Sequence, residues 1–272
     1  MANRAARSLV TQRAGSVAFL LSETQDRFFE DPNFTTLLRG CTTALAEQDL
    51  PLVLITAGNE AERRRVAPFL SAHHVDGVLL FSSHRGNPMI DVLRRAELPF
   101  VCCGKPLGRR GAVSSVAADD REGARNMVRY LIESGRTRIA TITGPRDTPG
   151  GLERLAGYRE TLAEHGIAYD KRLVATGDYS RESGESCMHR LLTRAPDDIA
   201  VGGFDDSPVA VTTRPRLTTI LWTEVGDRAA AIPLRWERSQ SRPLCQLGTV
   251  AVKTRSICAR SHDSCDRRIE TI

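Results

Sequence analysis

Hydrophobic and polar positions form two alternating kinds of segment along roughly the first two hundred residues of the chain. Short apolar runs indicate buried strands, and most are followed by segments with apolar residues at three- and four-residue spacing, which is typical of amphipathic helices. Strands are predicted at 16–22, 50–56, 77–82, 98–103, 138–143, 172–176 and 199–204, and helices at 33–48, 60–73, 88–96, 121–134, 152–165 and 182–192. Unbroken apolar strands that alternate with helices indicate parallel sheets covered on both faces. The pattern therefore predicts an α/β fold.

The segment from Gly104 to Ala118 has no periodic element and contains three glycines. We interpret it as the crossover between two doubly wound parallel-sheet subdomains, 15–105 and 106–220. The tail, 221–272, has poor periodicity, with a short helix at 225–234 and a strand at 249–253 as its only candidate elements.

Three local signals refine this picture. The polar stretch 23–31 is predicted to be a loop, and either Asp31 or Asn33 can cap the helix that follows, because the side-chain oxygen of each can accept a first-turn N–H. Pro68 lacks an amide donor and is expected to kink the helix 60–73.

Composition places the chain among ordinary globular proteins, with 41% hydrophobic and 26% charged residues. Its apolar runs are far shorter than the about 20 residues that a membrane span needs. The first thirteen residues are basic but lack the apolar segment of a secretory signal, so we expect a cytoplasmic protein without a membrane partner.

The net charge of +5 does not indicate a nucleic-acid surface. Only three basic residues are lysine, a skew typical of GC-rich genomes, and no block of like charges forms a basic arm.

Of the seven cysteines, only Cys102 and Cys103 are close in sequence, and adjacent cysteines are not a C-x-x-C motif. We expect reduced thiols.

Enzyme motifs are absent from the sequence: it has no nucleophile elbow, zinc-protease motif, phosphate-binding loop or dinucleotide fingerprint. No cofactor and no metal site are expected. Asp205 and Asp206 are neighbouring carboxylates that leave three interpretations open. They could form an acid–base pair, Asp205 could bind ligand hydroxyls while Asp206 caps the next segment, or both could lie in a solvated turn.

Ligands of open parallel α/β sheets bind beyond the carboxyl ends of the strands. Several polar groups that could bind sugar hydroxyls follow predicted strands, and Phe34 or Tyr179 could provide a stacking face. The positions marked by this rule are Ser22, Glu23, Ser82, Ser83, Gly104, Gly144, Pro145, Tyr179, Asp205 and Asp206, together with Arg154 at the start of a helix.

A set of motifs, each weak alone, is specific in its order and spacing. The motifs are Asp31-Pro32-Asn33-Phe34, Val75-Asp76-Gly77-Val78-Leu79-Leu80, Gly135-Arg136-Thr137-Arg138-Ile139-Ala140, Thr143-Gly144-Pro145, Arg154-Leu155-Ala156-Gly157-Tyr158, Gly177-Asp178-Tyr179, 201–207 (VGGFDDS) and 215–220 (PRLTTI). Together they resemble the LacI/GalR family of bacterial transcriptional regulators, from about residue 3 to residue 220.

The resemblance implies a periplasmic-binding-protein-like (type I) fold of two α/β subdomains, with a small-molecule effector, often a sugar, in the cleft. It implies that Arg154, Asp205, Tyr179 and Ser22 contact the effector. Gly104 stands where some members have an effector-binding aspartate. It further implies a cytoplasmic homodimer that acts as a repressor.

Residues 1–14 resemble the hinge segment that follows the helix-turn-helix in this family. The resemblance implies that Arg4, Ala5 and Leu9 contact DNA, with Leu9 wedged into the minor groove. The DNA-binding headpiece itself is missing from the sequence, so operator DNA is expected as a partner only if a helix-turn-helix is supplied.

The second subdomain departs from the family pattern. The predicted helix that ends near Arg194 is followed almost at once by Pro196, where family members insert a strand and a helix with a polar residue that faces the effector. We expect a gap in the second sheet and exposed apolar faces beside it. The leading hypothesis is the effector-sensing region of a LacI-type regulator with an incomplete second subdomain. The alternative is a free-standing sugar-binding protein of the same fold.

Overall fold

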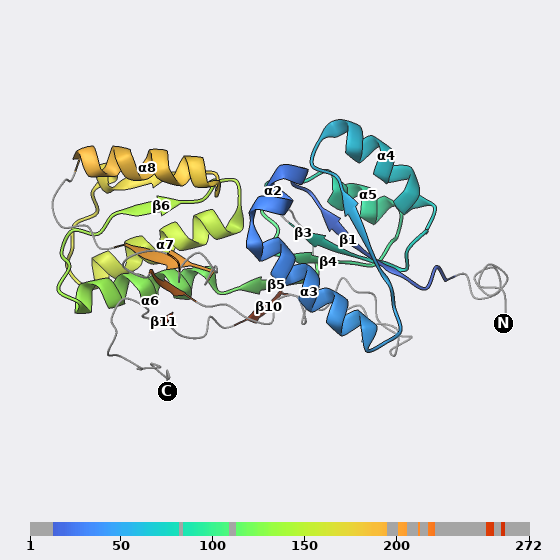
Figure 1. The fold of residues 1–272 in the computed structure, drawn as a ribbon, viewed down its shortest axis with the longest axis horizontal. Coiled ribbons are helices and arrows are strands. Elements are labelled where there is room, and N and C mark those ends of the chain that lie inside the picture. Colours follow the sequence, from blue (N-terminus) through green and yellow to red (C-terminus); the bar gives the residue numbers. More distant parts are fainter. Residues whose placement is uncertain are drawn as a thin grey trace. The chain divides into compact units, whose positions relative to one another are not determined.

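The computed structural model describes residues 13–81, 84–108, 113–194, 201–205, 212, 217–220, 249–252 and 257–258 (Figure 1). The chain divides into two compact units. The N-terminal unit comprises Met1–Ala117 with Glu224–Ala251, and the C-terminal unit comprises Ala118–Thr223 with Val252–Ile272. The predicted hinge residues Arg4, Ala5 and Leu9, the candidate helix 225–234, and Asp206 all lie outside the described residues.

The N-terminal unit is built on a six-stranded sheet in the order β10-β5-β4-β3-β1-β2. Its strands are β1 (Val17–Leu21), β2 (Leu52–Thr56), β3 (Gly77–Phe81), β4 (Phe100–Cys103), β5 (Ser115–Ala118) and β10 (Thr249–Val252). β1 pairs in parallel with β2 and β3, so that Val17 lies opposite both Leu52 and Gly77. Every residue of β1 and β3 is buried, as the unbroken apolar runs predicted.

Helices cover both faces of this sheet. They are α2 (Gln25–Glu30), α3 (Pro32–Ala46), α4 (Glu60–Ser71) and α5 (Met89–Arg95). Ala18 and Leu20 point to the face where Leu70 of α4 and Leu93 of α5 pack. Because side chains alternate along a strand, Phe19 points to the opposite face, where its ring meets Phe28 of α2.

Three local expectations for the N-terminal unit can be compared with the structure. The stretch predicted to be a loop contains α2, which Thr24 caps, so that prediction was wrong. Asp31 is the cap of α3, because its side chain accepts the N–H of Asn33. α4 continues through Pro68 to Ser71.

The segment interpreted as a crossover, 104–118, does contain the passage from the first unit to the second, but it also contains β5, a strand that was not predicted. β5 pairs with β4, with Cys102 opposite Ser115, and therefore extends the first sheet. The units consequently divide after Ala117 rather than at the predicted position between residues 105 and 106. Four cysteines, Cys41, Cys102, Cys103 and Cys187, are buried free thiols, as predicted.

The C-terminal unit contains two separate small sheets among its described strands. One pairs β6 (Thr141–Thr143) with β7 (Val174–Thr176), and the other has the order β11-β9-β8, with β8 (Gly202–Phe204), β9 (Thr218–Ile220) and β11 (Ile257–Cys258). Its helices are α6 (Asp120–Glu133), α7 (Pro149–Glu164) and α8 (Arg181–Arg194), with a 3-10 turn at Lys171–Leu173. In Figure 1, β6 lies between α7 and α8.

α6 and α7 form the main helix pair of this unit. Gly157 permits their close approach, because a Cβ at this position would overlap the carbonyl of Arg121. Tyr158, the next residue of α7, is buried and donates its hydroxyl to the carbonyl of Ile139 at 2.8 Å. The glycine and tyrosine of the Arg154–Tyr158 motif are therefore packing residues.

The division of the C-terminal sheet agrees with the gap predicted from the short connection after Arg194. Beside this connection, Val201 is 49% exposed and Leu192 is 39% exposed. Throughout the described part of the chain, no helix combines the length and apolar character needed to cross a membrane.

Candidate functional site

A charged cluster in the C-terminal unit is centred on Arg154, on the second turn of α7. Its Nε donates to Oδ1 of Asp120 at 2.8 Å, and its terminal nitrogen donates to Oδ1 of Asp205 at 3.3 Å. The guanidinium carbon lies 3.7 Å from the ring centroid of Phe204, a cation–π distance. Asp120 is the first residue of α6. Phe204 is the last residue of β8, and Asp205 follows it. Residues from α6 and β8 therefore converge on a cation carried by α7.

In this cluster, burial disfavours the charged forms of the side chains, and the attraction between opposite charges favours them. Burial raises the pKa of Asp120, although the guanidinium of Arg154 acts to lower it. Burial disfavours the charged form of Arg154, but Asp205 and Asp120 outweigh burial and raise the pKa of Arg154. The three side chains keep between 17 and 23% of their surface exposed. Arg154 is therefore a fixed cation, and its two carboxylates offer hydrogen-bond acceptors close to solvent.

Tyr179 lies near this cluster in a strained backbone conformation. Its φ angle is +72°, in the left-handed region that non-glycine residues rarely adopt. The hydroxyl lies 3.1 Å from Oγ1 of Thr148, the residue that caps α7. The ring rests against Gly144, where a Cβ would overlap it, and the Tyr179 side chain remains partly exposed.

Gly150 lies between Tyr179 and the charged cluster. A Cβ built on Gly150 would lie 3.3 Å from the Tyr179 hydroxyl and 3.5 Å from Oδ2 of Asp120. The structure therefore brings together three predicted site residues, Arg154, Tyr179 and Asp205, within the C-terminal unit. An aromatic ring beside fixed polar groups is the usual composition of a small-molecule site.

A second polar group lies at the carboxyl ends of β1 and β3 in the N-terminal unit. The backbone N–H of Ser22 donates to the carbonyl of Phe81 at 3.2 Å, which aligns the two strand ends. Glu23 is 8% exposed, and its Oε1 lies 2.9 Å from Nε2 of His84. Ser22, predicted from its position after the first strand, thus adjoins a carboxylate–imidazole pair.

Other predicted positions have different surroundings. Phe34 is 7% exposed and packs against Phe28, so little of its ring is left for a ligand to stack upon. Gly104 has a φ of +103°, which suits glycine in the turn after β4. Ser82, Ser83 and Asp206 lie outside the described residues, and so does the acid–base interpretation of Asp205 and Asp206, which depends on Asp206.

Sequence reasoning missed Asp120 and His84. Asp120 precedes a predicted helix and resembles an ordinary first-turn acid, because its partner Arg154 is 34 positions away in sequence. His84 follows a predicted strand at the edge that the strand-end rule marks, so that rule, extended by two residues, could have found it.

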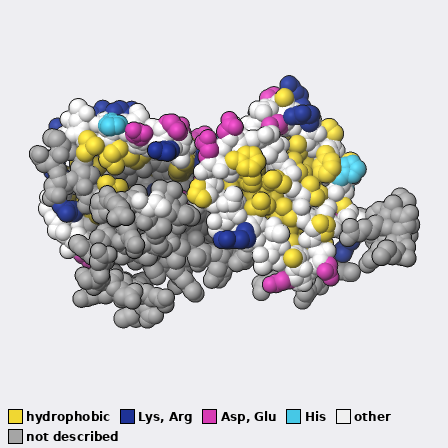
Figure 2. Space-filling model, in the orientation of Figure 1, with side chains coloured by type: hydrophobic (Ala, Val, Ile, Leu, Met, Phe, Trp, Pro, Cys, Tyr) yellow, Lys and Arg dark blue, Asp and Glu magenta, His cyan; other side chains and the backbone are white. Residues whose placement is uncertain are grey.

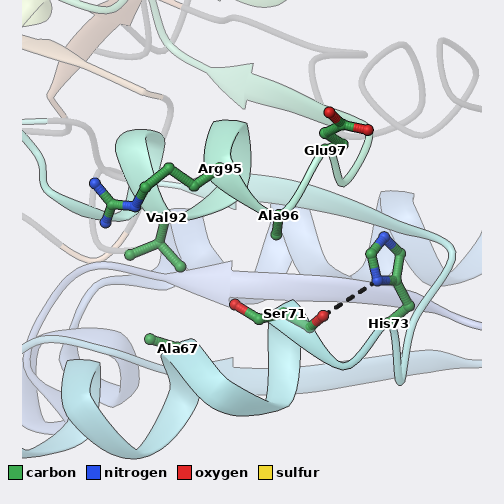
Figure 3. Close-up of a pocket in the computed structure, with 7 residues that line it drawn as sticks. All are labelled: Ala67, Ser71, His73, Val92, Arg95, Ala96 and Glu97. Atoms are coloured by element: carbon green, nitrogen blue, oxygen red, sulfur yellow. Dashed lines mark hydrogen bonds between the residues drawn. The ribbon is translucent and has the colours of Figure 1, made fainter.

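A surface pocket of about 420 Å³ in the N-terminal unit is distinct from these groups (Figure 3). It lies between the carboxyl-terminal ends of α4 and α5, where Nδ1 of His73 lies 3.2 Å from the carbonyl of Ser71. Helices that follow parallel strands run back, so their carboxyl-terminal ends lie at the amino edge of the sheet. This pocket is therefore remote from Ser22 and Glu23. Within the described residues, no group of three or more His, Cys, Asp or Glu side chains could hold a metal ion.

Comparison with known proteins gives a consistent set of relatives. A family profile described as "Periplasmic binding proteins and sugar binding domain of LacI family" matches residues 14–216. The HTH-type transcriptional regulator CelR of Thermobifida fusca is 40% identical over 247 residues, covering 80% of this chain and 73% of that protein. The ribose operon repressor of Escherichia coli is 28% identical over 246 residues, with 79% and 72% covered. A solved structure, the transcriptional regulator CelR–cellobiose complex, superposes with a TM-score of 0.86 at 32% identity, covering 96% of this chain and 91% of that one.

The extent of the CelR match bears on the divided C-terminal sheet. The match covers 80% of the 272 residues, which is about 218 residues, whereas the alignment is 247 positions long. At roughly thirty positions, therefore, CelR has a residue and this chain has none. A strand and a helix with their connections take about 20–30 residues. The shortfall therefore agrees in size with the strand and helix predicted to be missing after Arg194.

Proposed function

The chain belongs to the LacI family of transcriptional regulators, and from this membership we propose that it senses a glucose disaccharide of the cellobiose kind. The observation that carries the proposal is the cluster in which Arg154 bridges Asp120 and Asp205 against Phe204. A relative named CelR and a solved CelR–cellobiose complex that superposes on this chain support the choice of sugar.

Each proposed contact has a chemical reason. Carboxylates accept hydrogen bonds from sugar hydroxyls, and a guanidinium donates to hydroxyl and ring oxygens. Asp205 and Arg154 therefore supply an acceptor and a donor side by side. The partly exposed ring of Tyr179 supplies an apolar face for a pyranose, and its contact with Gly144 fixes the orientation of that face.

We propose that Ser22, at the carboxyl end of β1, is a ligand-binding residue of the N-terminal unit. Phe34 has a supporting role in this proposal, because its ring packs on Phe28 and thereby anchors α3 to α2. The pocket between α4 and α5 has no role in this proposal.

We propose that effector binding changes the affinity of the regulator for DNA, because the two binding equilibria are linked. A ligand that binds one conformation of a regulator more tightly shifts the population toward that conformation, and the effect on DNA affinity is reciprocal. Operator recognition requires a helix in the major groove, and CelR is named as an HTH-type transcriptional regulator. Both relatives and the solved structure are named as regulators or repressors, which favours a regulator over a free-standing sugar-binding protein.

A homodimer is the assembly that we propose for this regulator. β2 is an edge strand of the N-terminal sheet, and Leu54 on this strand is 43% exposed. Phe29 on α2 and Phe69 on α4 are also exposed, and Figure 2 shows hydrophobic side chains gathered on this face of the unit. An exposed apolar patch beside an open strand edge is typical of a protein interface.

Isothermal titration calorimetry with cellobiose tests the proposed effector, with maltose and ribose as comparison sugars. We expect Asp205→Asn and Arg154→Met each to weaken cellobiose binding by more than about tenfold, as expected when a hydrogen bond to a charged group is lost. Arg159→Met is the matched control. Arg159 lies on the same helix and stacks on Tyr169 at 4.5 Å, outside the cluster. The absence of cellobiose binding by the unmodified chain, or equal losses in all three variants, would refute the proposal.

A further inference from the structure

The surface pocket between the carboxyl-terminal ends of α4 and α5 lies within the N-terminal unit, and none of the residues proposed to bind the sugar lines it (Figure 3). Its volume of about 420 Å³ falls in the range of about 300–1,000 Å³ that is usual for small-molecule sites. Three apolar side chains and four polar or charged ones line it: Ala67, Val92 and Ala96, with Ser71, His73, Arg95 and Glu97. This mixed lining suits a small molecule that has both charged groups and an apolar body.

Two of the polar lining residues have backbone conformations that glycine normally provides. His73 has a φ angle of +54° and Glu97 one of +52°, and each is the first residue after the C-cap of its helix. Glycine is common at this position because it has no Cβ penalty in the left-handed region. Other residues in this region cost free energy, and such strain is frequent at ligand sites. The fold therefore keeps two polar side chains where glycine would be less strained.

One end of the pocket is rich in hydrogen-bond acceptors. Nδ1 of His73 lies 3.2 Å from the carbonyl of Ser71, so this nitrogen carries the proton, and Nε2 of the neutral ring is an acceptor. The Ser71 hydroxyl and the Glu97 carboxylate add further acceptors to the lining. The carboxyl-terminal end of a helix also carries partial negative charge, and α4 has no basic residue in its last turn to offset it. These features favour an ammonium group at this end.

The guanidinium of Arg95 lies at the other end of the pocket. Figure 3 shows it on the side opposite to His73 and Glu97, with Ala96 between them. A guanidinium binds a carboxylate through two parallel N–H···O bonds. In the part of the chain that the structure describes, the side chains of Arg95 and Glu97 form no ion pair and no hydrogen bond, so both charges are available to a ligand.

The separation of these two charges restricts the kind of ligand. An α-amino acid carries its ammonium and carboxylate groups on the same carbon atom, whereas a dipeptide places them one residue farther apart, by about 3.5 Å in an extended chain. We propose that the pocket is a second small-molecule site, separate from the sugar site, and that it binds a zwitterionic dipeptide. The three N–H donors of the ammonium group bind His73, Ser71 and Glu97, and the carboxylate binds Arg95. Small apolar side chains of the dipeptide contact the three apolar residues of the lining.

Calorimetry on the whole chain tests this proposal with alanyl-alanine and two derivatives that each lack one charge. N-acetyl-alanyl-alanine lacks the ammonium group, and alanyl-alanine amide lacks the carboxylate. We expect the unmodified chain to bind alanyl-alanine and to bind each derivative about three- to tenfold more weakly, because the pocket is open to solvent and charged contacts there are partly screened.

Arg95→Gln and Glu97→Gln each remove one charge from the pocket. Arg95→Gln should bind alanyl-alanine and its amide equally, because its contact with the carboxylate is already lost, and should still discriminate against the N-acetyl derivative. Glu97→Gln should show the reverse pattern. Glu97→Gly should also weaken dipeptide binding, but it should raise the midpoint of urea unfolding because glycine relieves the left-handed conformation.

Two matched controls carry the same chemical changes outside the pocket. Arg94→Gln alters the neighbouring arginine in the last turn of α5, which does not line the pocket. Asp49→Asn alters an acidic residue that follows α3 and has a φ angle of +56°. Both controls should keep the affinity for alanyl-alanine and the discrimination between its derivatives.

Three results would overturn the proposal. They are no binding of alanyl-alanine by the unmodified chain, a loss in Arg95→Gln or Glu97→Gln that is equal for all three compounds, and a lower urea midpoint in Glu97→Gly, which would assign that side chain to stability. Titration of the same variants with cellobiose separates this site from the proposed function. Unchanged cellobiose affinity supports a separate site, whereas a loss in Arg95→Gln or Glu97→Gln would assign the pocket to the sugar and refute the dipeptide.

Discussion

Arg154→Met removes the cation shared by two part-buried carboxylates while keeping a side chain of similar length. The guanidinium lies 2.8 Å from Asp120 and 3.3 Å from Asp205. At an effective dielectric constant of about 20, each contact corresponds to about 5–6 kcal/mol of gross attraction. Most of this attraction offsets the lost hydration of the three groups.

The net effect of the substitution is smaller than these gross terms. Removing one partner of a buried pair typically costs about 3–5 kcal/mol, because a charge is left buried and unpaired. Since the three side chains are 17 to 23% exposed, solvent screens part of this cost. We therefore expect the free energy of unfolding to fall by about 3 kcal/mol at pH 7.

The deficit should depend on pH in a defined direction. Burial raises the pKa of Asp120 above its ordinary value of 3.8, and Arg154 opposes this rise. Without Arg154 the pKa of Asp120 rises further. A carboxyl group whose pKa is raised in the folded state contributes stability at low pH that is lost as the pH increases through the folded-state pKa. The variant should therefore recover stability, relative to the unmodified chain, as the pH is lowered from 7 toward 4.

Urea unfolding followed by circular dichroism measures this effect at pH 7, 5.5 and 4.5. The double variant Asp120→Asn with Arg154→Met is the control, because it removes the titrating group along with the cation. We expect the double variant to be at least about 1 kcal/mol more stable than Arg154→Met at pH 7 and to lack its recovery at low pH. An unchanged urea midpoint for Arg154→Met, or a double variant that is no more stable than the single one, would refute the argument.

Three further predictions address other parts of the molecule. Gly144→Ala should displace the ring of Tyr179 and weaken cellobiose binding by about tenfold or more in calorimetry, because the two cannot occupy the same space; equal affinity would show that the ring contact is dispensable. Leu54→Glu should shift the chain from dimer to monomer in analytical ultracentrifugation, whereas Leu192→Glu, on the C-terminal unit, should not; an unaffected dimer would exclude the β2 edge as the interface. Burial raises the pKa of Tyr158 from 10.0 to about 12, so its contribution to stability is complete below pH 10 and is lost as the pH increases toward 12. Tyr158→Phe should remove this alkaline decline in urea unfolding, and a decline that persists would assign it to another group.

The long elements of the fold were predictable because each satisfies one periodicity rule. β1 and β3 are unbroken apolar runs, and α3 has Phe34, Cys41 and Leu45 buried on one face. α2 escaped prediction because its six residues contain only two adjacent phenylalanines, too few to establish a helical period. β5 escaped because its four residues are small and it owes its conformation to pairing with β4.

The site was predictable only in part, for a similar reason. Strand-end positions such as Ser22 and Asp205 follow from topology, and the rule that marks them needs no tertiary contact. Asp120 and His84 gain their significance from partners 34 and 61 residues away, and such distances carry no periodic signal. Phe34 illustrates the opposite case. Its aromatic ring suggested a stacking face for a ligand, but the ring is buried and packs against Phe28 instead.

If the cluster around Arg154 binds the effector as we propose, binding and stability are coupled in the C-terminal unit, because the same side chains serve both. The unit has two separate sheets among its described strands, and Arg154 ties β8 to the α6–α7 helix pair through Asp120, Asp205 and Phe204. A continuous sheet would make such a link less important, since backbone hydrogen bonds would join the strands directly. Here a ligand that binds this cluster also strengthens the connection between β8 and the helices. Cellobiose should therefore raise the midpoint of thermal unfolding by mass action, and Arg154→Met should reduce both that increase and the midpoint itself.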